Sequence, residues 1–83
     1  MNENLISLNQ LPANQLGKVR QIRSHGITRR RLLDLGLIDQ TLVKALQTSP
    51  AGDPTAYQFR GAVIALRAED ASQIMIELVS ESR

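Results

Sequence analysis

Apolar residues along this chain occur mainly in short segments in which apolar and polar positions alternate. The alternation is strict near the end, where Ile74, Ile76 and Leu78 fall on one side of the chain. Such segments, bounded by turn residues, predict β-strands, because successive side chains of a strand point to opposite faces. After an apolar start at residues 5–8, the pattern predicts five short strands, at residues 17–23, 41–48, 55–60, 62–66 and 74–78.

Two of these segments carry further detail. Val19 and Ile22 are three residues apart, a spacing that a one-residue β-bulge would explain. Tyr57 and Phe59 are two residues apart, so they share one face of their strand and are expected in the core. Gly61 follows and permits a kink or a bulge before the next strand.

The spacing of apolar residues becomes helical between residues 28 and 35. Thr28 is the expected N-cap, because its hydroxyl can accept a hydrogen bond from an unpaired backbone N–H group. Gly36 suits the left-handed residue that ends many helices, and Leu37 would then pack back on Leu32 in a Schellman motif. A helix of two turns is not stable alone, so we expect it to lie against the strands.

Turn residues are dense at residues 50–54, where two prolines, a glycine and Asp53 predict a hairpin loop. Residues 68–73 are expected to form one or two helical turns, with their acidic residues placed early, against the helix dipole. Short antiparallel strands with a small core favour closure into a barrel. The pattern therefore predicts one mainly β domain, residues 1–83, with a short helix in the first long connection and a helical turn before the last strand.

Composition narrows the class of protein. The 83 residues include no cysteine, which excludes disulfides and thiolate metal sites and fits a reducing cytosol. No apolar stretch approaches the roughly 20 residues that span a bilayer, and residues 1–4 do not begin a signal peptide. We therefore expect a cytoplasmic protein that does not insert into a membrane.

Charged residues are distributed unevenly between the two parts of the chain. Residues 1–33 contain six basic residues and one acidic residue, whereas residues 34–83 contain four basic and seven acidic residues. The two parts therefore carry formal charges of +5 and −3. Such asymmetry indicates either an anionic partner or a solvated surface.

Several short motifs, taken in order, resemble the FeoA family over roughly residues 5–79. They are residues 30–37 (RRLLDLGL), 52–54 (GDP), 60–61 (RG) and 64–67 (IALR), with Ala71 and Ile74. The resemblance implies an SH3-like small barrel that serves as a cytosolic accessory of bacterial ferrous iron uptake. It also implies a partner, the cytosolic portion of FeoB, a membrane GTPase-permease that imports Fe(II). Asp39 and Gln40 depart from the family pattern, which usually has Pro-Gly there, so the turn type is left open.

Candidate catalytic and metal-ligating residues are sparse. Iron and zinc sites use histidine, cysteine and grouped carboxylates, and this chain has one histidine, His25, in an expected loop. No nucleophile has an evident base, and there is no glycine-rich phosphate loop. We therefore expect no enzyme activity, no cofactor and no high-affinity metal site, so that any GTP chemistry would belong to the partner.

The helix at residues 28–35 is the expected partner-binding site, because binding surfaces often lie on connections between rigid elements. The candidate residues are Arg30, Arg31, Leu33, Leu37 and Asp53. The two arginines would steer an acidic surface, and one of the two leucines would anchor in an apolar pocket. Each has a structural alternative: a solvated face for the arginines, the core for the leucines, and a turn for the aspartate.

A second class of function is a small-barrel nucleic-acid-binding module or a stand-alone repressor-type SH3-like domain. Small barrels bind single strands, and the arginines at residues 29–31 could contact phosphates. Such platforms stack bases on exposed aromatic residues, whereas Tyr57 and Phe59 are expected in the core. Nucleic acid is therefore not the expected partner. The oligomeric state and the part of FeoB contacted are left open.

Overall fold

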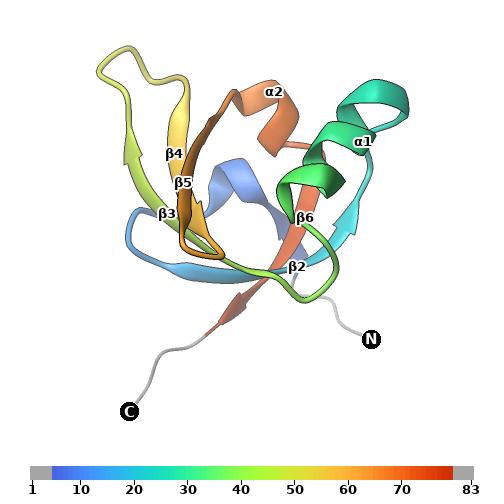
Figure 1. Cartoon of the computed structure of the whole chain (residues 1–83). Helices are drawn as coiled ribbons and strands as arrows, with labels where there is room; N and C mark the ends of the chain where they lie inside the picture. The colour runs from blue at the N-terminus through green and yellow to red at the C-terminus, as the bar shows by residue number, and fades with distance from the viewer. Residues whose placement is uncertain (1–4, 80–83) are drawn as a thin grey trace.

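The computed structural model describes residues 5–79, which form six strands and three short helical segments. In chain order these are β1 (Leu5–Ser7), the 3₁₀ turn η1 (Leu8–Gln10), β2 (Leu16–Ile22), α1 (Gly26–Leu35), β3 (Leu42–Thr48), β4 (Thr55–Phe59), β5 (Ala62–Leu66), α2 (Ala68–Ala71) and β6 (Ile74–Val79). All strands pair antiparallel in one sheet of order β1-β6-β2-β3-β4-β5. Figure 1 shows this sheet bent round on itself into a small barrel, with α1 outside the sheet and α2 across one end.

The strands follow the alternation of the sequence. The five predicted strands correspond to β2–β6, and the apolar start at residues 5–8 adds a short sixth strand that pairs with β6. The pairing of β2 with β6 shifts register between Val19 and Gln21, which confirms the predicted bulge. The bulge lets Val19 stay buried although the next apolar residue, Ile22, is three positions away.

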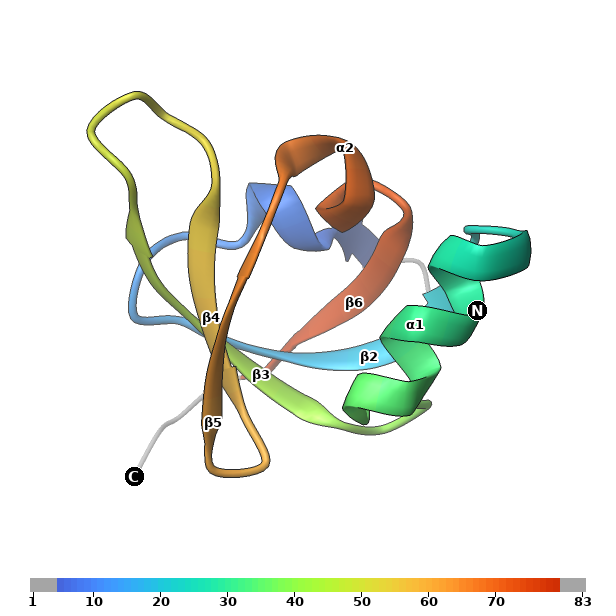
Figure 2. The same cartoon turned by 45° about the horizontal axis from the view of Figure 1, so that its top comes forward.

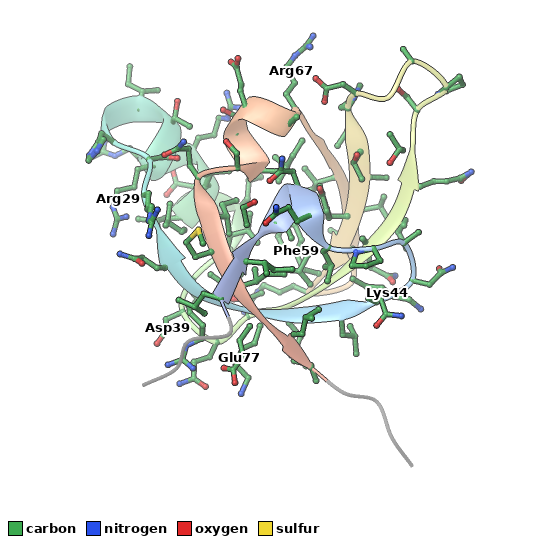
Figure 3. The ribbon with its side chains drawn as sticks, turned by 180° about the vertical axis from the view of Figure 1, so that it is seen from behind. Arg29, Asp39, Lys44, Phe59, Arg67 and Glu77 are labelled. Atoms are coloured by element: carbon green, nitrogen blue, oxygen red, sulfur yellow. The ribbon has the colours of Figure 1, made fainter. Side chains whose placement is uncertain are left out.

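Aliphatic side chains fill the barrel interior. The buried apolar residues are Leu8, Leu11, Val19, Leu32, Leu37, Val43, Ala45, Tyr57, Phe59, Leu66, Ala71, Ile74 and Ile76. Tyr57 and Phe59 lie inside, as predicted, and Figure 3 shows Phe59 in the middle of the molecule. Burial raises the pKa of the Tyr57 phenol above its ordinary value of 10.0, and its hydroxyl donates to the Leu8 carbonyl at 3.4 Å. This perturbed group therefore belongs to the core and does not mark a functional site.

The start of α1 differs from the prediction, whereas its end agrees with it. The helix begins at Gly26, and His25 holds the N-cap position without a side-chain hydrogen bond, so the predicted Thr28 cap is wrong. Gly26 has a φ of 60°, which glycine adopts at little cost and which turns the chain sharply from β2 into the helix. At the other end, Gly36 has a φ of 105°. Its N–H group donates to Leu33, and that of Leu37 donates to Leu32, the predicted Schellman motif.

Three residues of the described chain that are not glycine also have a positive φ: Asn14, Gln40 and Arg60. Gln40 has a φ of 78°, and its N–H group donates to the Val19 carbonyl at 2.6 Å. The turn before β3 therefore takes a left-handed residue although the sequence offers no glycine there. Between β4 and β5, Arg60 and Gly61 have φ values of 55° and 80°. They form a two-residue hairpin turn, not the kink or bulge expected at Gly61.

Candidate functional site

The candidate surface lies on α1, which occupies the connection between β2 and β3. Figures 1 and 2 show the helix lying along the outside of the barrel next to one end of β2. Leu32 is fully buried and holds the inner side of α1 against the core. Leu37, one residue beyond the C-cap, is also fully buried and fixes the point where the chain returns to the barrel. The outer side of the helix is left to solvent.

The three consecutive arginines of α1 point in different directions. Arg29 donates from Nη1 to the Ile22 carbonyl at 2.8 Å, which ties the helix to the end of β2. Arg31 approaches Asp70 of α2, with 3.9 Å between Nη2 and Oδ2, so it faces the neighbouring helix. Arg30 is exposed, and within residues 5–79 its side chain makes no ion pair. Of the three, Arg30 is therefore the least engaged in contacts within the described residues, whereas Arg31 is accessible beside a weak surface pair.

The two candidate leucines have opposite environments. Leu37 is fully buried, so the expectation that it could serve as a surface anchor is wrong: the Schellman motif directs it into the core. Leu33 is only half-buried. It lines a shallow hollow of about 330 Å³ on the outer side of α1, together with Gly26, Arg29, Arg30 and Asp34. Leu33 and Arg30 are thus brought together, as two of the predicted residues.

Ile27, on the first turn of α1, is 84% exposed and is not among the residues that the sequence pattern predicts for the site. A helix that starts at Thr28, two residues after the observed start at Gly26, would leave Ile27 in a loop. Residues three apart on a helix are neighbours, so Ile27, Arg30 and Leu33 form one row on its outer side. We call this row the α1 ridge. It presents one cation between two apolar side chains.

Asp53 lies apart from the α1 ridge and has structural contacts. Its Oδ1 accepts a hydrogen bond from the backbone N–H of Ala68 at 2.8 Å, at the first residue of α2. Its Oδ2 lies 3.9 Å from Nη1 of Arg67. In Figures 1 and 2, α2 lies between the β3–β4 loop, which carries Asp53, and α1. The residue thus acts as a capping group for α2, in place of the N-cap side chain that α2 lacks.

The arrangement is suited to binding. Among residues 5–79, no three or more histidine, cysteine, aspartate or glutamate side chains gather as a metal site would require. His25 is exposed at the start of α1. No helix in the described part of the chain is long and apolar enough to cross a membrane. What the α1 ridge offers is a positive charge and apolar surface on a helix held by the barrel, which fits a protein partner with an acidic, grooved surface.

Comparison of the chain with known proteins identifies a matching family. The FeoA domain family matches residues 6–78 of the chain. A curated relative from Porphyromonas gingivalis, an Fe(2+) transport protein A/Fe(2+) transporter FeoB fusion protein, is 28% identical over 75 residues. The match covers 90% of this chain and spans 9% of the length of that relative.

Solved structures share the fold. The structure of a FeoA-like protein from Clostridium acetobutylicum is 29% identical, with a TM-score of 0.87 over 99% of this chain and 95% of that one. Stenotrophomonas maltophilia FeoA, a zinc complex described as an SH3 domain protein, is 24% identical, with a TM-score of 0.78 over 87% of this chain and 89% of that one. A manganese-dependent transcriptional repressor, 15% identical, has a TM-score of 0.84 over 94% of this chain and 38% of that one. The last two show the fold alone, which is the predicted SH3-like small barrel.

Proposed function

The chain belongs to the FeoA domain family, and from this membership we propose that it is an accessory of ferrous iron uptake that binds the cytosolic portion of a FeoB-type membrane GTPase. The observation that carries the proposal is the fusion relative, in which an Fe(2+) transport protein A and an FeoB transporter are one polypeptide. Fusion holds two modules at a high effective concentration, which is useful when the modules act on one another. In our proposal the chain supplies the binding surface, and the partner supplies GTP hydrolysis and the passage of Fe(II).

The α1 ridge is the face that we assign to this contact. Arg30 and Leu33 line the same hollow, and Ile27 is exposed beside them. An arginine between two apolar side chains is a typical composition for the centre of an interface, where arginine is enriched and charge is desolvated in a complementary pocket. Arg31 sits at the margin, where it would steer an acidic partner and contribute less to the final affinity.

The nucleic-acid and repressor alternatives have weaker support. The manganese-dependent repressor shares the fold at 15% identity, and fold alone does not define function. Tyr57 and Phe59 are buried in the barrel, so they form no stacking platform for bases. The family match and the fusion relative both favour iron transport.

Calorimetric titration of the chain against the cytosolic portion of a FeoB-type protein tests the proposal. Arg30→Glu should weaken binding at least about tenfold at low salt, because it reverses a charge at the centre of the contact. Arg31→Glu should weaken it less, mainly through a slower association rate. Lys44→Glu is the matched control, since it makes the same charge change on β3, and Figure 3 shows Lys44 across the molecule from Arg29 of α1.

Circular dichroism of each variant provides the folding control, because exposed charges rarely stabilise a fold. Two results contradict the proposal. One is a wild-type chain that does not bind the cytosolic portion at any salt concentration. The other is a folded Arg30→Glu variant whose affinity equals that of the Lys44→Glu control at low salt.

A further inference from the structure

The two edges of the sheet are unequal. The edge strands are β1 and β5. Strand β1 has only three residues and is followed directly by η1, and very short edge strands are one way in which proteins prevent unwanted pairing. Strand β5 has five residues, and within residues 5–79 it pairs only with β4. In Figures 1 and 2, no strand of the described part of the chain runs along its other side.

The hairpin register determines which backbone groups of β5 face the open side. Arg60 and Gly61 form a two-residue turn, so Phe59 and Ala62 are the pair that closes it, and a closing pair is hydrogen-bonded. Hydrogen-bonded and non-hydrogen-bonded pairs alternate along an antiparallel ladder. Ala62, Ile64 and Leu66 therefore direct their backbone groups to β4. Val63 and Ala65 direct theirs to the open edge.

The open edge has none of the usual protection within the strand. Residues 62–66 (AVIAL) contain no charge, no proline and no bulge, all of which natural edge strands use to prevent association. Val63 is 59% exposed and Ala65 is also exposed, so the outer side chains offer apolar contact beside the unpaired backbone groups. An added strand would thus gain both ladder hydrogen bonds and apolar burial.

Positive charge stands at both ends of this edge. Arg60 precedes β5 and Arg67 follows it, and both are exposed. The Arg67 side chain is 70% exposed. Its Nη1 lies 3.9 Å from Oδ2 of Asp53, which makes a weak ion pair at the surface. Figure 3 shows Arg67 pointing away from the body of the molecule. A segment that extends along β5 would pass one arginine at each end: Arg60, whose side chain lies beside Gly36, and Arg67, which lies beside Asp53.

The positive charges of Arg60 and Arg67 favour a segment of another protein over a second copy of this chain as the strand that pairs with β5. If two copies paired antiparallel through β5, with Ile64 opposite its symmetry mate, Arg67 of one copy would lie opposite Gly61 of the other, next to the second copy's Arg60. Like charges placed close together across a pairing are destabilising. An extended segment that carries acidic residues at its two ends would instead face an arginine at each end. We propose that the open edge of β5 binds such a segment from another protein: an apolar strand of about five residues with aspartate or glutamate on both sides.

The proposal does not rest on the proposed function of the α1 ridge, because it concerns a different surface and its test uses a synthetic peptide. The probe is a fluorescent peptide of sequence DEVTVTVED, measured by polarisation against the full chain. A second peptide replaces the four acidic residues by lysine. A third keeps all side chains but carries N-methyl groups at alternate backbone nitrogens, which removes donors to the ladder.

We expect the acidic peptide to bind and the lysine and N-methylated peptides to bind at least about tenfold more weakly, the first from charge and the second from lost hydrogen bonds. Val63→Pro removes an N–H group that only the added strand would use, so it should weaken binding by a similar factor while the chain stays folded. Where Val63→Pro is poorly folded by circular dichroism, Val63→Glu replaces it as a charged block of the edge, because its negative charge also repels the acidic peptide. Arg30→Glu on the α1 ridge should leave peptide binding unchanged.

Three results would overturn the inference. The first is absence of binding by the acidic peptide at millimolar concentration. The second is equal binding of the acidic, lysine and N-methylated peptides, which would indicate adsorption without strand pairing. The third is a dimer of the chain, seen by light scattering, that Val63→Lys dissociates, because the edge would then be occupied by a second copy.

Discussion

The inner and outer sides of α1 use the same residue type in opposite ways. Leu32 is fully buried against the barrel, whereas its neighbour Leu33 is half-exposed beside Arg30 on the outer side. Burial of a leucine stabilises a fold by a few kcal/mol, so the inner side holds the helix in place. The outer side contributes little to that stability and is therefore available for binding. The comparison separates residues that position the site from residues that form it.

The largest expected effect is on the inner side. Leu32→Ala should lower the free energy of unfolding by about 2–5 kcal/mol, because it removes buried methyl groups and leaves a cavity. Leu33→Ala, one residue away, should cost less than about half as much, since its side chain already contacts solvent. Urea denaturation followed by circular dichroism measures both. Equal losses for the two variants would show that the two sides of α1 do not differ as described.

A smaller effect is expected at the end of the helix. Gly36→Ala should lower the free energy of unfolding by about 1–2 kcal/mol, because the left-handed conformation is unfavourable for alanine and not for glycine. The φ of Gly36 is 105°, and an added Cβ would lie 2.7 Å from Cδ of Arg60, which would have to move. The same denaturation measurement tests this. If the variant is as stable as the wild type, the helix does not need a glycine at position 36 to end. The burial of Leu37 would then not depend on the left-handed conformation of residue 36.

The smallest effect is a gain, at the turn that follows α1. Gln40 has a φ of 78°, and replacement by glycine should relieve the left-handed strain at some cost in the entropy of the unfolded chain. The net result should be an increase of about 0.5–1 kcal/mol in the free energy of unfolding. Affinity for the partner should not change, because the substitution leaves the α1 ridge intact. A loss of stability would show that the Gln40 side chain contributes more than its backbone strain costs.

Local patterns in the sequence were enough to predict much of the fold. Strict alternation located Ile74 and Ile76 in the core, and Gly36 located the end of the helix, because both signals depend only on near neighbours. The start of the helix was wrong because two local signals competed: a capping threonine at 28 and a glycine at 26 that turns the chain. In the structure the helix begins at this glycine, whose φ is 60°.

The candidate site was harder to predict because it depends on the direction in which each side chain points in the folded protein. Leu33 and Leu37 were both candidate anchors with the core as the alternative, and helical spacing could not choose between them because Leu37 lies past the helix end. Ile27 was passed over because it lay outside the expected helix. The role of Asp53 depends on Ala68, fifteen residues along the chain, a contact that no local pattern contains.

The measurement that tests the central claim most directly is an NMR titration of the ¹⁵N-labelled chain with the cytosolic portion of a FeoB-type protein. We expect the largest amide shift changes at Ile27, Arg30 and Leu33, and small changes at Lys44 on the far side of the barrel. A second titration with Arg30→Glu should show the same pattern at markedly higher partner concentration. If the largest changes fall on the outer face of β3 or on β5, and α1 is unaffected, the assignment of the partner site to the α1 ridge is wrong.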